Sequence, residues 1–183
     1  ISLEIGDRKG EAAVYRNLGT VFQSLGNYAQ AQEFHEKALA ITLKIGDRKG
    51  EAAVYRNLGS VFRMLGNSAQ AQEYHEKAIT IRKEIGDREG EASDYGNLGA
   101  FFQSIGNYDE AQEYYEKALA ISLEIGDRKG EAADYGNLGT VFQSLGNYSK
   151  SQEYYERALA IILEIGDRKG EAAVYGNLGT VCQ

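Results

Sequence analysis

The sequence predicts an all-α solenoid built from antiparallel helix pairs. Three observations predict it: a period of 40 residues, apolar side chains at helical spacing, and glycine followed by asparagine or aspartate at regular points. Residues 17–28 are identical to residues 137–148, and 30 of 40 positions agree between residues 7–46 and 127–166. A single helix pair of this kind cannot bury both faces of its second helix, so neighbouring copies are expected to stack.

The period sets the internal boundaries of the 183-residue chain, which we interpret as one solenoid segment over residues 1–183. Residues 1–6 are expected to be the end of the second helix of a preceding repeat. Residues 167–183 are expected to be the first helix of a fifth copy. Because the chain starts and stops inside repeats, we interpret it as a fragment. The complete repeats are predicted at 7–46, 47–86, 87–126 and 127–166.

The first helix of a repeat is predicted from its ends and from its apolar stripe. Gly6 follows an apolar run and is predicted to end a helix in the left-handed conformation, with Asp7 capping the next helix. Gly26 is predicted to end that helix, and Asn27 to cap the following one. The apolar stripe between them advances by three and four residues through Tyr15, Leu18, Phe22 and Leu25.

The second helix continues the same spacing and is predicted to be buried on two sides. Its stripe consists of Ala31, Phe34, Ala38, Ile41 and Ile45, which Leu39 widens. Helices of about 18 residues, roughly 27 Å long, are expected. The links of about two residues make neighbouring helices antiparallel.

Gly19 stands inside the first helix, where glycine costs about 1 kcal/mol relative to alanine. The same glycine recurs in every copy. We therefore predict a close crossing of the two helices at this point, with Ala31 and Ala38 as the facing residues.

Composition narrows the function. The net charge of −7 without a sustained basic stripe argues against nucleic-acid binding. No apolar run reaches the roughly 18 residues of a membrane span. The single cysteine excludes an intrachain disulfide and favours a reducing compartment, so we expect an intracellular, cytoplasmic protein. The two histidines, His35 and His75, are expected to pack rather than to bind metal, and we expect no cofactor and no catalytic site.

These residues resemble the tetratricopeptide repeat (TPR) motif over essentially the whole chain. The matching positions in the first repeat are Tyr15, Leu18, Gly19, Phe22, Gly26, Tyr28, Ala31 and Ala38. The 40-residue period is similar to the variant in the Pins/LGN polarity adaptors and to long TPR signalling arrays. The usual proline after the second helix is missing, and His35 and His75 stand where Tyr115 and Tyr155 fill an aromatic slot. The resemblance implies a right-handed superhelix whose first helices line a concave groove.

A recurring asparagine on the first helix is the main candidate binding residue. It lies on the face opposite the apolar stripe, where Ala13, Thr20 and Ser24 also lie, and this face lacks the usual exposed Glu and Lys. An amide both donates and accepts, so it can pair with a peptide backbone; the resemblance implies the same use. A contact within the helix or between repeats is the alternative. Besides the arginines considered next, the candidate peptide-binding residues are Asn17, Asn57, Asn97, Asn137, Asn177, Thr20, Gln103 and Gln143.

Charge changes along the chain on the same side of the helices. Arg16, Arg56 and Arg63 occur in the first two repeats, while later copies have glycine at the position of Arg16. Asp94 and Asp134 replace valine nearby, so the inner wall is expected to run from basic to acidic. We hypothesise that the three arginines meet acidic or C-terminal carboxylate groups of a peptide. The alternative is ordinary solvated charge.

The predicted function is a non-catalytic scaffold or adaptor segment that binds an extended peptide in its concave groove. Two alternatives remain open: a regulatory or sensor array of a larger signalling protein or enzyme, and a structural spacer without a ligand. The expected partners are proteins or peptides, not nucleic acid or membrane. We also expect copies of the chain to stack end to end through the apolar faces left open at its two ends.

Overall fold

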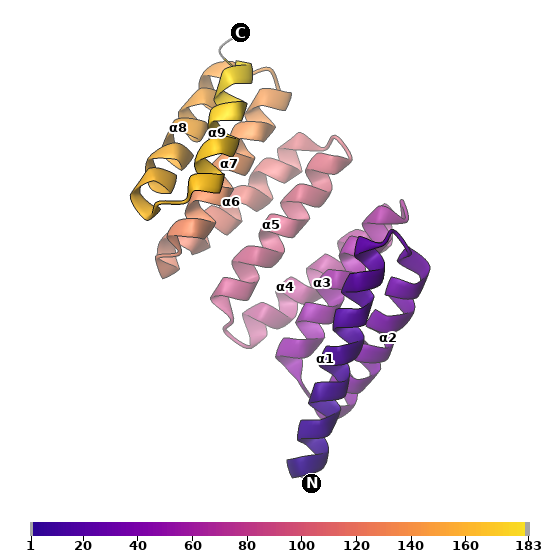
Figure 1. Ribbon diagram of the computed structural model, residues 1–183. Coiled ribbons are helices and arrows are strands. Elements are labelled where there is room, and N and C mark those ends of the chain that lie inside the picture. The colour runs from indigo at the N-terminus through magenta and orange to yellow at the C-terminus, as the bar shows by residue number, and fades with distance from the viewer. Residues whose placement is uncertain (1, 182–183) are drawn as a thin grey trace. The chain divides into compact units, whose positions relative to one another are not determined.

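The computed structural model describes residues 2–181, with side chains described for residues 7–180. Over residues 2–181 the chain forms nine α-helices and no strand, joined by links of two or three residues. The helices belong to two compact units, Ile1–Asp87 and Arg88–Gln183. Figure 1 shows that successive helices within each unit run antiparallel to one another, as the short links require.

Each repeat contributes two helices, which we call helix A and helix B. The helices A are α1 (Ser2–Ser24), α3 (Arg48–Met64), α5 (Arg88–Ser104), α7 (Arg128–Ser144) and α9 (Arg168–Val181). The helices B are α2 (Tyr28–Ile45), α4 (Ser68–Glu84), α6 (Tyr108–Ile125) and α8 (Tyr148–Ile165). The all-α solenoid of helix pairs predicted from the sequence is confirmed.

Within each unit the helices A form the inner layer. Every helix packs against the next one along its unit, and helices A of adjacent repeats also touch: α1 with α3, α5 with α7, and α7 with α9. Over the described residues no such contact joins α2 to α4 or α6 to α8. Helices A therefore lie closer together than helices B, so the concave side of each unit is made by helices A.

The helix ends follow the predicted chemistry. Gly46 ends α2 with φ 70°, in the left-handed region that favours glycine, and its N–H reaches the carbonyl groups of the last turn. The side chain of Asp47 then accepts from the backbone N–H of Gly50 and caps α3. Asn27 caps α2 in the same way through the N–H of Gln30. These caps turn the chain back on itself in two or three residues.

The predicted helix end at Gly6 is wrong. Helix α1 runs without interruption from Ser2 to Ser24, so Gly6 and Asp7 lie inside it. At Gly46 the backbone takes the left-handed conformation and the chain turns back, whereas at Gly6 the backbone stays helical. Extending an existing helix adds one hydrogen bond per residue, and that gain decides the conformation here. Ile1 lies outside the described residues.

Most residues of the apolar stripes pack into the core, although Leu18 of α1 is 37% exposed. Phe22 stacks on Phe34 with ring centroids 5.2 Å apart, and Phe142 stacks on Tyr154 at 5.3 Å. Leu25 was predicted to extend this stripe, but it is 72% exposed. It lies beyond the last residue of α1, in the link, where the helical spacing no longer directs side chains inward.

The glycine inside helix A does mark a close crossing, but the facing residue differs from the prediction. A methyl carbon added at Gly19 would lie 2.5 Å from the ring of His35, and one at Gly139 would lie 2.7 Å from the ring of Tyr155. Ala31 and Ala38 are fully buried but are not the nearest atoms. In the first four repeats the glycine is thus required because a ring from helix B occupies the space that a Cβ atom would need.

Candidate functional site

The asparagine that recurs on helix A is accessible in every repeat. Asn17 and Asn177 are exposed, and Asn57 and Asn137 are half-buried. Across the described part of the chain, the side chains of these four residues form no hydrogen bond with the protein. Their amides therefore lie beside the inner face with donor and acceptor groups open to solvent or to a ligand.

Asn97 differs from the other four. Its amide nitrogen donates to the backbone carbonyl oxygen of Ser93 at 2.9 Å, within its own helix. The within-helix alternative considered from the sequence therefore applies to this one asparagine.

Unit 1 contains a basic pocket of about 550 Å³ on the helix A layer. It brings together Arg16 and Thr20 from α1 with Arg56 and Asn57 from α3. Arg63 does not line this pocket, since it is exposed in the last turn of α3. Asn17 is also outside the lining. The other lining residues are Lys9, Asp47, Lys49, Gly50, Ala53 and Arg82.

The basic side chains of this pocket outnumber its one carboxylate. Asp47 lies 3.6 Å from Lys9, and the neighbouring Asp87 lies 3.5 Å from Lys49 and 2.5 Å from Arg82. The pocket lining contains five cationic side chains and a single carboxylate, so its net charge is positive. A positive lining favours an anionic group.

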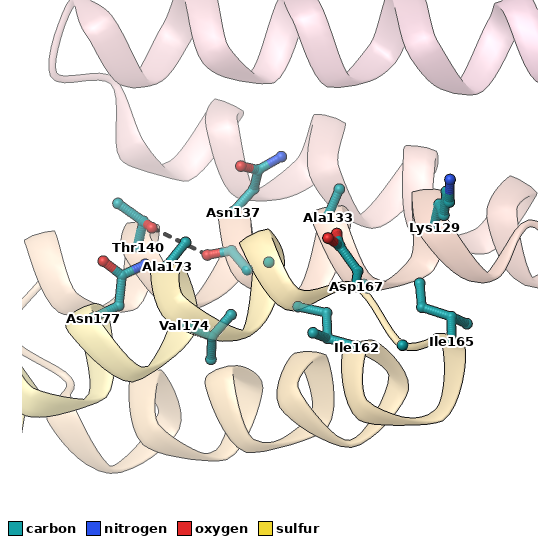
Figure 2. Close-up of a pocket in the computed structure, with 14 residues that line it drawn as sticks. Lys129, Ala133, Asn137, Thr140, Ile162, Ile165, Asp167, Ala173, Val174 and Asn177 are labelled. Atoms are coloured by element: carbon teal, nitrogen blue, oxygen red, sulfur yellow. Dashed lines mark hydrogen bonds between the residues drawn. The ribbon is translucent and has the colours of Figure 1, made fainter.

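Unit 2 contains a pocket of about 610 Å³ between α7 and α9, closed on one side by the end of α8. Figure 2 shows Asn137, Thr140 and Asn177 toward one end of it, and Lys129 and Asp167 toward the other. The rest of the lining is small or apolar: Ala132, Ala133, Gly136, Ile162, Ile165, Gly166, Gly170, Ala173 and Val174.

The other candidate polar residues are used within the fold. Gln143 accepts from the Tyr155 hydroxyl at 3.1 Å, and its amide nitrogen donates to Thr180 at 2.8 Å. Gln103 accepts from Tyr115 at 2.9 Å. The Thr20 hydroxyl donates to the backbone carbonyl of Arg16. These bonds orient the groove wall, so these side chains are less available to a ligand than the asparagines.

The expected acidic inner wall is wrong for the two aspartates on which it rested, because Asp94 and Asp134 are buried. Asp134 accepts from the Ser122 hydroxyl at 2.9 Å, between α6 and α7. Burial raises its pKa to about 7, with Asp127 adding to the rise and the Ser122 bond opposing it. This position belongs to the stripe that packs on the preceding helix B, which is why valine stands there in other repeats.

The two histidines occupy the aromatic slot, as predicted. His35 and His75 are fully buried over Gly19 and Gly59. Burial, with a smaller effect of Arg16, lowers the pKa of His35 to about 4. Burial, with smaller effects of Arg63 and Arg56, lowers the pKa of His75 to about 4. Both rings are therefore neutral at pH 7. In unit 2 tyrosine fills the slot.

Within the described residues, no group of three or more His, Cys, Asp or Glu side chains could hold a metal ion. None of the described helices combines the length and the apolar character needed to cross a bilayer.

The family of the chain is identified by its sequence, in agreement with the helix pairs described above. The model of the tetratricopeptide repeat matches residues 10–84, 91–164 and 131–183. The chain belongs to the tetratricopeptide repeat family. Tetratricopeptide repeats serve as protein-interaction or sensor arrays, and this chain is a repeat array of that kind. No curated protein matches it by sequence.

Solved tetratricopeptide-like structures have the same fold. BtubC (BKLC) from P. vanneervenii has a TM-score of 0.75 at 27% identity, over 85% of this chain and 65% of that one. The signal transduction ATPase (STAND protein) with a tetratricopeptide repeat sensor from Pyrococcus horikoshii has 0.83 at 24%, over 95% and 27%. A Rap protein complexed with competence and sporulation factor has 0.76 at 17%, over 93% and 48%. The chain spans less than two thirds of each.

Proposed function

We propose that this array is a non-catalytic scaffold or adaptor segment that holds an extended peptide of a partner protein against its helices A. The observation that carries the proposal is the set of open amides on the inner face. The side chains of Asn57 and Asn137 line pockets and form no hydrogen bond with the described protein. An extended peptide has unpaired backbone N–H and C=O groups, and an asparagine amide complements both.

The basic pocket of unit 1 gives the bound peptide a preferred chemistry on that unit. Arg16 and Arg56 lie in the same pocket as Asn57, and Arg63 adds charge in the last turn of α3. A carboxylate of the peptide, from an acidic side chain or its C-terminus, would accept charge-assisted hydrogen bonds there.

The asparagine contribution is tested within unit 2 with the double variant Asn137→Ala and Asn177→Ala, since both residues line the same pocket. A display library of random 12-residue peptides is screened against the full chain, and the tightest peptide is measured by calorimetry. Micromolar affinity is expected for the unaltered chain. Losing two amide contacts at about 0.5–1.5 kcal/mol each should weaken it roughly 5- to 150-fold. The control is Gln152→Ala on the exposed face of α8. Equal affinity for the double variant and the control would refute the role of the amides.

The arginine contribution is tested separately with an acidic peptide from the same screen. Arg16→Ala or Arg56→Ala should weaken binding and reduce its dependence on salt. Arg157→Ala, an exposed arginine on α8, is the charge-matched control. Binding that is insensitive to both salt and Arg56→Ala would identify the arginines as ordinary surface charge.

A sensor segment of a larger protein is the second candidate. The P. horikoshii ATPase has a repeat sensor with this fold, and the present chain spans 27% of that protein. In such a protein the chemistry would lie in flanking domains. The full reading frame distinguishes the two candidates, because a catalytic domain adjoining the array would favour the sensor.

Self-stacking of copies is a further part of the proposal. Val14 on α1 is 57% exposed, whereas Val54 at the same position of α3 is 1% exposed under the preceding helix B. Tyr175 on α9 is likewise 52% exposed. These exposed apolar faces resemble the faces that pack against each other between neighbouring repeats. Copies of the chain should therefore associate end to end at high concentration. Sedimentation that shows a monomer at millimolar protein would exclude this.

A further inference from the structure

The unit 2 pocket has chemistry that the unit 1 pocket lacks. Gly136 of α7 lines it at the repeat position that Arg16 and Arg56 occupy in unit 1. Apart from its chain neighbours and the backbone of its own helix, no atom lies within 4 Å of a methyl carbon added at Gly136. Unlike Gly139, Gly136 is therefore not required by a close helix crossing. The space that its side chain would fill is empty.

The surfaces around this space are apolar. Ile162 and Ile165 from α8 and Val174 from α9 form one side of the pocket, and Ala133 and Ala173 stand at its sides (Figure 2). Ile162 and Val174 belong to the core of the unit, so the pocket reaches down to the packed interior. An aliphatic or aromatic group placed there would exchange water contact for contact with these side chains.

Charge argues against an ionic occupant. The two charged lining residues, Lys129 and Asp167, have opposite signs and lie toward one end, away from Asn177. A charged side chain seated beside Gly136 would lose water without gaining a counter-charge of its own. The unit 1 pocket, by contrast, offers Arg16 and Arg56 at the matching position.

We propose that the pocket between α7 and α9 receives one bulky, uncharged apolar side chain of the bound peptide. The inference rests on the proposed function and adds a residue class to it. The amides of Asn137 and Asn177 stand on either helix beside the pocket and hold the peptide backbone, while the side chain between them enters the space beside Gly136. The volume of about 610 Å³ accommodates a leucine or phenylalanine side chain with room for the adjoining backbone.

The test uses the full chain and capped 12-residue peptides of glycine, serine and asparagine with one central guest residue: Leu, Phe, Ala or Glu. Affinity is measured by calorimetry, and amide NMR shifts locate the peptide. Leu and Phe guests should bind at least about tenfold more tightly than Ala, and Glu no better than Ala. The shifts should include Gly136, Gly170 and Ala173.

The decisive variant is Gly136→Arg, which places in unit 2 the residue that unit 1 has. It should remove the preference for Leu and Phe, while Gln152→Arg, with the same added charge on the outside of α8, should keep it. Equal affinities for all four guests with shifts along the helices A would overturn the apolar pocket and leave the peptide groove standing. A series in which no guest binds would overturn the groove as well.

Discussion

Two glycines three residues apart on α7 should respond to the same substitution with opposite signs. At Gly139 an added methyl carbon would lie 2.7 Å from two ring carbons of Tyr155, and at Gly136 it would meet nothing within 4 Å. We therefore expect Gly136→Ala to stabilise the protein and Gly139→Ala to destabilise it.

The magnitudes follow from helix propensity and from overpacking. Alanine gains about 0.8–1 kcal/mol over glycine inside a helix, and Gly136→Ala should realise most of that gain. Gly139→Ala gains the same term, but the ring must move by several tenths of an ångström. Tyr155 is fully buried and its hydroxyl is bonded to Gln143, so the overpacking cost is about 1–3 kcal/mol. The two variants should therefore differ by about 1–3 kcal/mol.

The assay is urea unfolding followed by circular dichroism, with amide exchange on α7 to assign the transition to unit 2. Gly179→Ala is the internal control, since this glycine has the same repeat position but no atom within 4 Å of an added methyl carbon. The reasoning would be refuted if Gly139→Ala proved as stable as Gly136→Ala.

Three further predictions concern pH and helix ends. The folded-state pKa of His35 is about 4, whereas its ordinary value is 6.5. The free energy of unfolding should therefore fall as the pH drops from 6.5 toward 4, by up to about 3 kcal/mol per histidine. The variant His35→Tyr should reduce this loss, measured by urea unfolding at pH 4.5. For Asp134 the shift has the opposite direction. Its pKa is raised from 3.8 to about 7, so its contribution to the stability of the fold is lost as the pH rises through this range. The double variant Ser122→Ile and Asp134→Val, which replaces Asp134 and its hydrogen-bond partner, should therefore stabilise unit 2 at pH 8 by roughly 2–4 kcal/mol. Gly166→Ala, at φ 71°, should cost about 1 kcal/mol in thermal unfolding.

The chain supplies a control for each of these. The variant His35→Tyr places in the first repeat the residue type that Tyr155 provides in unit 2. An unchanged loss of stability at low pH would show that the histidines do not cause it. The Ile–Val replacement copies the pair Ile162 and Val174 at the same repeat positions, and equal pH dependence before and after it would contradict the raised pKa. For the cap, Gly136→Ala is the matched glycine with a helical backbone, and it should move stability the other way.

Much of the fold was predictable because it is local. The caps at Asn27 and Asp47 and the aromatic stripe through Phe22 depend on residues within one or two helical turns, and the repetition supplies the same evidence several times. The errors came where local chemistry competes with packing. Gly6 and Asp7 have the sequence of a helix end, yet the helix continues through them, and Leu25 continues the apolar spacing after the helix has ended.

The candidate site divides in the same way. The sequence placed the recurring asparagines on the exposed face, because the helical period fixes which side chains oppose the apolar stripe. It could not separate Asn97, which bonds to its own helix, from Asn137, since the two have nearly the same neighbours in sequence.

By itself, the sequence determined a stack of helix pairs with a short-chained, amide-bearing side, because repetition, caps and apolar spacing are properties of one repeat. Tertiary structure alone decided which of those side chains stay available. Only the packing of a second helix shows that Asp134 is buried and that Gln143 bonds to Thr180. The same packing shows that Gly136 lines an apolar pocket. The physical reason is that burial and pairing belong to contacts between repeats, which no single repeat contains.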